Sequence, residues 1–194
     1  MFDRGKFFDE SLTESALTKQ NILKSCRESV YKAIDLIKQS LQNGGKIMLC
    51  GNGGSAADSQ HLATEFVIRL SHDIKRPAIA AIALTTDSSM LTAGGNDIGF
   101  ENVFARSVEA LGKNGDVLIG ISTSGNSKNV INAFTKAKEK GVKTIALLGG
   151  SGGKMKGMAD VDIIIPSSNV QRIQEGHITV GHIICESVER ELYS

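Results

Sequence analysis

The stretch that decides the fold is residues 46–65, KIMLCGNGGSAADSQHLATE. Residues 46–50 are mostly apolar and predict a buried strand, which the glycine-rich residues 51–54 interrupt. A helix is expected next, capped at Ser55 or a neighbour and running to about Arg69. Such a turn is an anion site, because backbone N–H groups and the positive end of the helix dipole point at it.

Two titratable side chains follow on the same predicted helix. His61 and Glu65 are four residues apart, so they share one helical face. A phosphate-binding turn followed by an imidazole and a carboxylate suggests an enzyme that acts on a phosphorylated small molecule.

The composition indicates one ordinary globular domain. A chain of 194 residues can bury one core well and is short for two domains. Its 22 basic and 21 acidic residues give a net charge of +1, which argues against nucleic acid as a partner. Cys26, Cys50 and Cys185 are widely spaced in mostly apolar surroundings, which predicts reduced, buried thiols.

No segment of the sequence indicates a membrane partner. The longest uninterrupted apolar run, residues 78–84, is far too short to cross a bilayer. The first ten residues, MFDRGKFFDE, lack the apolar segment of a signal peptide. We therefore expect a cytoplasmic protein.

After an N-terminal helical extension, strands and helices alternate along the chain. The extension occupies residues 1–43, with a break expected near residues 19–21, and the α/β core occupies residues 46–194. Short apolar strands that alternate with helices predict a doubly wound, flavodoxin-like α/β domain with a five-stranded parallel sheet and helices on both faces. Strands are expected at residues 46–50, 78–84, 117–121, 143–148 and 162–165, helices at 88–93, 103–111, 128–140 and 170–192, and a turn at 94–97.

Polar clusters fall at the predicted carboxyl ends of three strands, where ligands of such domains bind. They are residues 51–55, 85–87 and 122–127. The last cluster, STSGNS, offers four hydroxyl groups, whereas a helix cap needs only one. Phosphate or sugar oxygens are the favoured partners of these hydroxyls, and simple helix capping is the alternative.

Two glycine-rich segments partly match nucleotide-binding motifs. Residues 51–56 fit the dinucleotide fingerprint, but Asp87 lies well past the position expected for its acidic residue. Residues 149–154 resemble a Walker loop, yet Leu148 and Met155 occupy positions that require Gly and Ser or Thr. Nucleotide binding is therefore the weaker alternative, and residues 149–154 are expected to form a surface loop.

The last predicted helix carries Gln174 and His182, which lie within about 80° of each other around its axis. Together with His61 and Glu65 they offer the ligand types of a zinc site. A histidine among the apolar residues of 180–184 is more often a core residue than a metal ligand, although the second His/Glu pair weakens that interpretation. Spacing alone leaves both interpretations open, because it does not bring the two helices together.

Four segments resemble the sugar isomerase (SIS) domain proteins. They are residues 51–55 (GNGGS), 94–97 (GGND), 121–127 (ISTSGNS) and 172–175 (RIQE). Within that family the chain is similar over nearly its whole length to the phosphoheptose isomerases. The resemblance implies a single SIS domain over residues 1–194 and an aldose–ketose isomerase. It would convert sedoheptulose 7-phosphate to D-glycero-D-manno-heptose 7-phosphate, the first step toward ADP- or GDP-heptose for bacterial surface polysaccharide.

The same resemblance implies the roles of individual residues. Glu65 and His182 would be the acid/base pair, and one zinc ion per subunit would be held by His61, Glu65, Gln174 and His182. The family's enzymes are homotetramers with active sites between subunits, which would give the N-terminal helices their role. The implied substrate-binding residues are Asn52, Gly53, Gly54, Ser55, His61, Glu65, Asn96, Asp97, Ser122, Thr123, Ser124, Ser127 and Gln174.

These roles agree with what the reaction requires. Aldose–ketose isomerisation passes through an ene-diol and needs a base, an acid and positive charge near the developing oxyanion. Glu65 would be the base, His182 the acid or proton shuttle, and zinc the electrophile.

A non-catalytic relative is the alternative function. Some SIS-domain proteins only bind sugar phosphates or regulate replication initiation, and the regulator lacks the matching acid and terminal histidine. This chain has both Glu65 and His182, which favours the enzyme. Gln171 is a departure, because some phosphoheptose isomerases carry an acid near the RIQE segment, and it puts one substrate hydroxyl contact in doubt.

Overall fold

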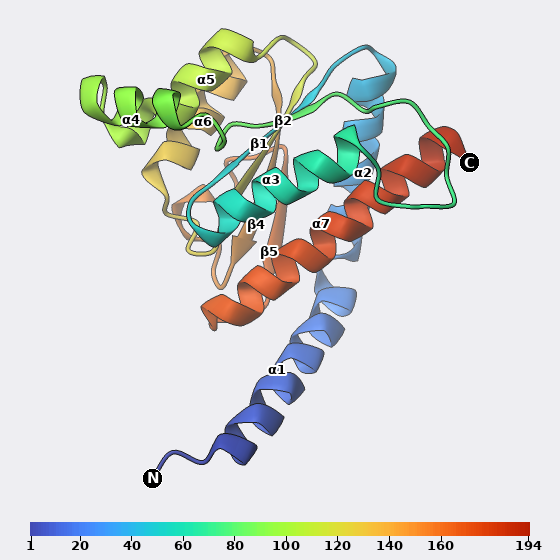
Figure 1. Ribbon diagram of the computed structural model, residues 1–194, viewed down its shortest axis with the longest axis vertical. Coiled ribbons are helices and arrows are strands. Elements are labelled where there is room, and N and C mark those ends of the chain that lie inside the picture. Colours follow the sequence, from blue (N-terminus) through green and yellow to red (C-terminus); the bar gives the residue numbers. More distant parts are fainter.

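Five parallel strands form the centre of the protein, in the order β2-β1-β3-β4-β5 (Figure 1). This is the strand order of flavodoxin-like doubly wound domains, as predicted. The structure is a computed structural model, and it describes all of residues 1–194. The strands are β1 (Ile47–Gly51), β2 (Ala81–Ala83), β3 (Val117–Ser122), β4 (Lys143–Gly149) and β5 (Val161–Ile165).

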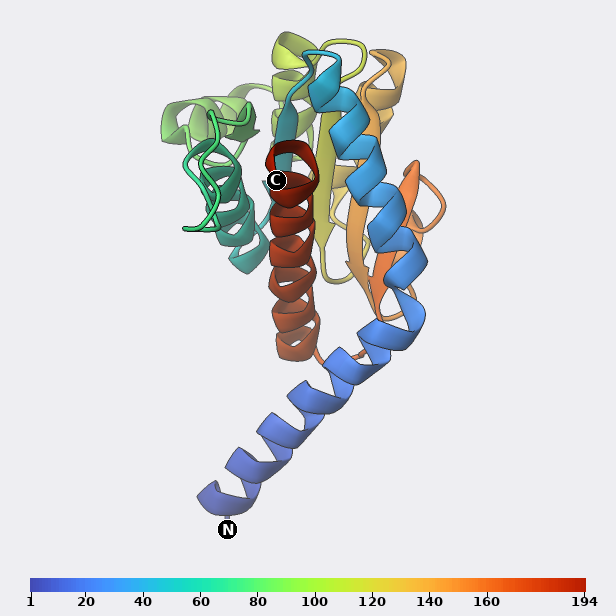
Figure 2. The same ribbon diagram turned by 90° about the vertical axis from the view of Figure 1, so that its right-hand side faces the viewer.

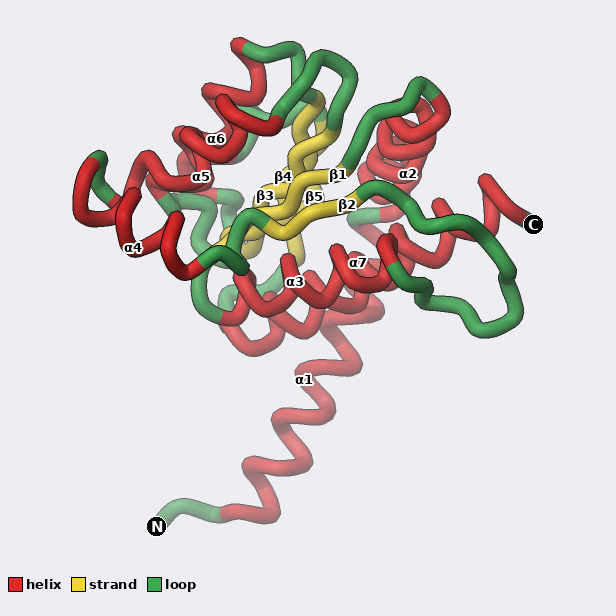
Figure 3. The backbone as a smooth tube through the Cα atoms, turned by 45° about the horizontal axis from the view of Figure 1, so that its top comes forward, coloured by secondary structure: helices red, strands yellow, loops and turns green.

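Helices cover both faces of the sheet (Figures 2 and 3). Helices α2, α3 and α7 supply one buried cluster with the strands, and α5 and α6 supply the other. None of the helices has both the length and the apolar character needed to cross a membrane. The helices are α1 (Arg4–Ser25), α2 (Arg27–Gln42), α3 (Gly54–Val67), α4 (Ser88–Asp97), α5 (Val103–Leu111), α6 (Lys128–Glu139) and α7 (Val170–Tyr193), with short 3-10 turns η1 (Phe100–Asn102) and η2 (Gly153–Met155).

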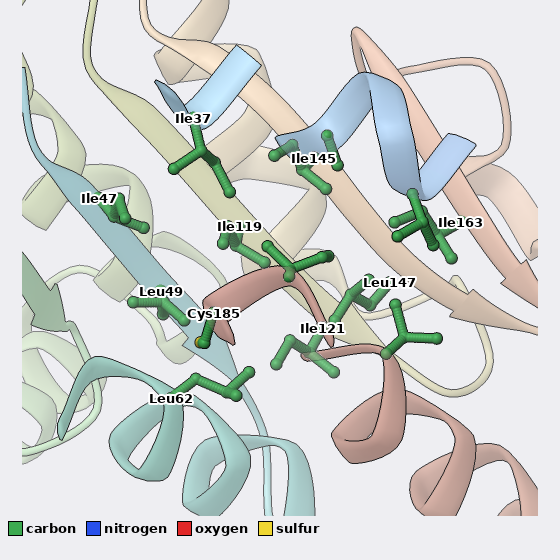
Figure 4. Packing of buried hydrophobic residues seen from close by; sticks show 14 of the residues in the cluster. Ile37, Ile47, Leu49, Leu62, Ile119, Ile121, Ile145, Leu147, Ile163 and Cys185 are labelled. Atoms are coloured by element: carbon green, nitrogen blue, oxygen red, sulfur yellow. The ribbon is translucent and has the colours of Figure 1, made fainter. Parts of the chain in front are cut away.

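Strand side chains alternate between the two cores. In β1, Leu49 belongs to the cluster on the α2, α3 and α7 face, and Met48 to the cluster on the opposite face. Figure 4 shows Ile37 of α2, Leu62 of α3 and Cys185 of α7 around the strands of the first core. Both faces of the central strands are buried, which explains why the sequence reads there as unbroken apolar runs.

All three cysteines are buried and unpaired, as predicted. Cys50 lies in β1 with no exposed surface. Burial raises the pKa of its thiol to about 12, because the thiolate would have to leave water. The cysteines therefore behave as small apolar core residues.

The break between the N-terminal helices lies at Cys26, and its predicted position at residues 19–21 is wrong. Ile22 and Cys26 are both buried, and the Cys26 thiol donates to the Ile164 carbonyl of β5 at 3.4 Å. The chain therefore changes direction where it reaches the sheet, and the N-terminal part of α1 extends away from the body (Figure 1).

Two other predicted elements differ from the structure. Strand β2 is shorter than residues 78–84, and Ile82 is 40% exposed, so this edge strand is not buried on both faces. Residues 94–97 form the last turn of α4 and not a free turn. That helix begins at a side-chain cap, because Asp87 accepts from the Met90 N–H at 2.9 Å, and it continues through both glycines.

The amino ends of β1 and β3 are joined through one buried carboxylate. Asp116 accepts hydrogen bonds from the N–H groups of Lys46 at 3.0 Å and Lys113 at 2.8 Å, and it pairs with the Lys46 ammonium. Burial alone would raise the pKa of Asp116, but these interactions outweigh it and hold the pKa below its ordinary value. The resulting stabilisation is complete above the unfolded pKa of about 3.9 and is lost as pH falls through the lower native pKa.

Asp116→Asn should therefore lower the free energy of unfolding by about 1–3 kcal/mol at pH 7, because donors that face the carboxylate lose a charged partner. Urea denaturation followed by circular dichroism measures the difference from wild type, which should shrink as the pH is lowered below about 4. Asp35→Asn is the control, since this carboxylate is 76% exposed and lies 3.8 Å from Lys38. A difference that does not change with pH would contradict the assignment.

Candidate active site

The turn between β1 and α3 has the strand–turn–helix form that the sequence predicts. Gly53 precedes the helix with φ +55°, a conformation that glycine adopts at little cost. No side chain caps the helix, which starts at Gly54 and ends at Val67, two residues before the predicted end. Ser55, in the first turn, is only 4% exposed.

A pair of amides fixes this turn to the start of α6. Asn52 and Asn129 exchange two side-chain hydrogen bonds of 2.9 and 2.8 Å. Asn129 is buried, and the sequence analysis missed it because the partners are 77 positions apart. The β1–α3 turn and the β3–α6 loop are therefore held side by side.

The β3–α6 loop carries the four hydroxyl groups that the sequence singled out. Ser122 is buried and its Oγ lies 2.9 Å from the Oγ of Ser127. Ser127 occupies the position before α6 but makes no side-chain cap bond. Ser124 accepts from the Asn126 N–H at 3.2 Å. Helix capping thus does not account for these hydroxyls, which leaves them as candidate ligand contacts.

Residues 149–154 form the predicted surface loop, with Gly150, Ser151 and Lys154 exposed, and they also pack against the β3–α6 loop. The N–H groups of Lys154 and Met155 donate to the Asn126 side chain at 3.1 Å and to the Gly125 carbonyl at 3.0 Å. A Cβ on Gly125 would overlap the carbonyl oxygen of Gly152. The two loops therefore fit together only with a glycine at position 125.

Helices α3 and α7 bring three titratable side chains together. The Nε2 of His61 lies 2.8 Å from the Nε2 of His182 and 3.3 Å from Oε1 of Glu65. The candidate ligand atoms of all three lie within 4.8 Å of one another. Gly181 allows this approach, since a Cβ there would lie 2.7 Å from the side chain of Leu62.

This donor set fits a zinc ion. Zinc binds imidazole nitrogen and carboxylate oxygen at about 2.0–2.2 Å, which places tetrahedral ligand atoms roughly 3.3–3.5 Å apart. The spacing of His61 and Glu65 matches, and the two histidine nitrogens need to separate by about half an ångström. Two histidines and one carboxylate are also the protein ligands of several catalytic zinc sites, which keep a further position open.

The side-chain amide of Gln174 lies beside the glycine turn. Its amide nitrogen is 2.5 Å from the position that a Cβ on Gly54 would occupy. Gly54 is seven residues before His61, about 10 Å along the helix axis. The role of Gln174 as a fourth zinc ligand stays a prediction.

Asn96 and Asp97 are not hydrogen-bonded to the other predicted site residues. Both are exposed on the last turn of α4, where the Asn96 amide donates to the Asp97 carboxylate at 2.7 Å. Their part in substrate binding also stays a prediction.

Asp58 belongs to the neighbourhood of the cluster, although the sequence analysis did not single it out. Burial raises the pKa of its carboxyl group, and the charges of His61 and His182 partly oppose that effect. Its position three residues before His61 was the available signal, because residues at that spacing share a helical face.

The strand order and the loops at the carboxyl ends of the strands define a doubly wound α/β domain with a ligand site at that end of the sheet. A family model described as "SIS domain" matches residues 12–149. The chain therefore belongs to the SIS domain family.

Comparison with individual relatives shows which group of the SIS family the chain resembles. The chain is 52% identical to the phosphoheptose isomerase of Pelodictyon phaeoclathratiforme, over 94% of this chain and 87% of that protein. It is 50% identical to that of Clostridium acetobutylicum, over 96% and 95% of the two chains. The solved phosphoheptose isomerase of Neisseria gonorrhoeae superimposes with a TM-score of 0.90 at 45% identity, over 97% of this chain and 100% of that one. The one from Francisella tularensis gives a TM-score of 0.93 at 34% identity, with the same coverage. Within the SIS family, the chain groups with the phosphoheptose isomerases.

The packing of the two loops yields a stability test. Gly125→Ala should be markedly more destabilising than Gly44→Ala, although both positions have positive φ. The control carries only the backbone cost, about 1–2 kcal/mol, because nothing lies within 4 Å of a Cβ at Gly44. Overlap with Gly152 should add about 1–3 kcal/mol at Gly125. Equal urea midpoints for the two variants would mean that the loops separate freely.

Proposed function

We propose that the protein converts sedoheptulose 7-phosphate to D-glycero-D-manno-heptose 7-phosphate. The observation that carries the proposal is the cluster of His61, Glu65 and His182, two imidazoles and a carboxylate at the contact of α3 and α7. An acid/base cluster is what an aldose–ketose isomerase needs and a non-catalytic sugar-phosphate-binding or replication-regulating protein does not. Relatives about 50% identical over nearly the whole chain carry the name of this enzyme.

The two loops at the other end of α3 are the proposed phosphate site. Ser55, Ser122, Thr123, Ser124 and Ser127 supply hydroxyl groups beside the N-termini of α3 and α6. Both helix N-termini favour an anion, and phosphate oxygens accept hydrogen bonds strongly. Binding the phosphate there would hold the reacting carbons at a fixed place along α3.

Glu65 and His182 perform the proton transfers in this proposal. The Glu65 carboxylate takes a proton from C1 of the ketose, which gives an ene-diol, and returns a proton to C2. His182 moves a proton between the two oxygens, so that the C1 oxygen becomes the aldehyde and the C2 oxygen a hydroxyl. His61, Glu65 and His182, with Gln174 as a further ligand, would hold a zinc ion, which would supply positive charge near the developing oxyanion.

The proposed active form is a homotetramer with active sites between subunits. Helix α1 extends from the body (Figure 2) and exposes Phe7, Phe8 and Leu12 by 57%, 62% and 57%. Exposed apolar side chains on a protruding helix favour packing against another copy. The product would feed ADP- or GDP-heptose synthesis for surface polysaccharide or capsule, and we place the enzyme in the cytoplasm.

Glu65→Gln tests the base directly. Gln keeps the size and one oxygen acceptor but cannot take the proton, so kcat should fall at least ~100-fold. A coupled assay on sedoheptulose 7-phosphate measures turnover, and Glu139→Gln, an exposed change at the end of α6, is the control. Wild-type turnover in Glu65→Gln would remove this residue from the mechanism.

His182→Ala tests the zinc site through stability. Zinc bound to the native state raises the melting temperature by mass action, and loss of one ligand weakens that binding. The zinc-dependent rise in melting temperature should largely disappear in His182→Ala and persist in His72→Ala, which alters an exposed histidine outside the cluster. The tetramer, measured by light scattering, should survive in both. If His182→Ala kept the full zinc effect, His182 would not be a ligand.

A further inference from the structure

A buried ion pair lies beside the histidine cluster. Arg76, in the connection between α3 and β2, donates from Nε to Oε1 of Glu189 on α7 at 2.6 Å. Both side chains are 1% exposed, which distinguishes this pair from the exposed ion pairs of the helices.

The pair joins three segments of the chain. From Arg76, Nη2 donates to the Glu65 carbonyl at 2.8 Å and Nη1 to the Pro77 carbonyl at 2.9 Å. Glu189 also accepts from the Ser71 N–H at 2.9 Å. The end of α3, the connection that follows it and the last part of α7 are therefore held at one point.

The geometry connects this point to the chemistry. Glu65 contributes its carboxylate to the cluster and its carbonyl oxygen to Arg76. Glu189 follows His182 by seven residues, so both lie on nearly the same face of α7, about two turns apart. A displacement of Arg76 would therefore move Glu65 relative to His182.

Stability alone is a weak reason for such a pair. Removing two charges from water costs several kcal/mol per ion, and apolar replacements of similar volume are often equally stable or more stable. A planar guanidinium, in contrast, can bond a carboxylate and two carbonyls at once and so fix their relative positions.

We propose that Arg76 and Glu189 are positioning residues for catalysis, which hold the backbone of Glu65 so that its carboxylate stays in place against His182. Neither side chain touches the substrate in this proposal. It rests on the proposed isomerase function, and it adds to that function the residues that set the distance between base and acid.

The first variant is Arg76→Lys, which keeps a charge for Glu189 but carries its donors on one nitrogen and so cannot reach all three acceptors that Nε, Nη1 and Nη2 serve. We expect kcat to fall about 10–100-fold, as for a small misplacement of a catalytic group, with KM for sedoheptulose 7-phosphate within about twofold of wild type. Asp116→Asn is the matched control, because it also disrupts a buried carboxylate but at the amino end of the sheet. Its kcat should remain that of wild type.

A second variant keeps the test valid if Arg76→Lys folds poorly. Arg76→Met combined with Glu189→Leu replaces the pair by apolar side chains and avoids a lone buried charge. We expect near-wild-type melting temperature together with the same loss of kcat. Wild-type kcat in this folded double variant would overturn the proposal, and so would a loss of kcat in Asp116→Asn equal to that in Arg76→Lys.

A readout without substrate separates this proposal from the proposed function. The ring resonances of His61 and His182 in NMR spectra should shift in Arg76→Lys and stay unchanged in Asp116→Asn. If wild type failed to isomerise the heptose, the proposed function would fail, and these shifts would still decide whether Arg76 positions the cluster. Unchanged histidine resonances would overturn the positioning role.

Discussion

The close parallel contact of α3 and α7 is the constraint on which the active site depends. Two glycines allow it, because a Cβ on Gly181 would meet Leu62 at 2.7 Å and a Cβ on Gly54 would meet Gln174 at 2.5 Å. At this separation His61 and His182, 121 positions apart in the chain, place their ring nitrogens 2.8 Å from each other. Small residues at a helix contact thus create a site that neither helix has alone.

Helix α3 also links the two functions of the site. Its N-terminus lies at the glycine turn, and His61 lies about 10 Å further along the axis. A sugar phosphate with its phosphate at one end and its carbonyl at the other suits such a rigid spacing. The parallel sheet makes this possible, since it brings the β1–α3 and β3–α6 loops to one edge, where Asn52 and Asn129 join them.

Sequence reasoning succeeded where the pattern is local. Apolar runs between glycine-rich turns located the central strands. The four-residue spacing of His61 and Glu65 placed them on one helical face, where the structure has them 3.3 Å apart. It failed where tertiary packing decides. The chain bends at Cys26, where it packs against β5 and which no glycine or proline marks, and α4 continues through Gly94, which packs closely against Val103. The Asn52–Asn129 and Arg76–Glu189 pairs join distant positions, so no spacing rule could identify them.

A single chain encloses the histidine cluster only in part. The His61 side chain is 49% exposed, whereas that of Glu65 is 15% exposed. Charges that develop during proton transfer are stabilised best where water is excluded, because bulk water weakens every directed interaction. Within a single chain, the Glu65 side chain is already largely shielded from water at the contact of α3 and α7, and Arg76 bonds to its backbone carbonyl. The His61 side chain is not shielded in this way, and a second subunit that covered it would exclude water from this side of the cluster. The fold of one chain thus fixes the distances between the reacting groups, and the proposed homotetramer would exclude water from around them.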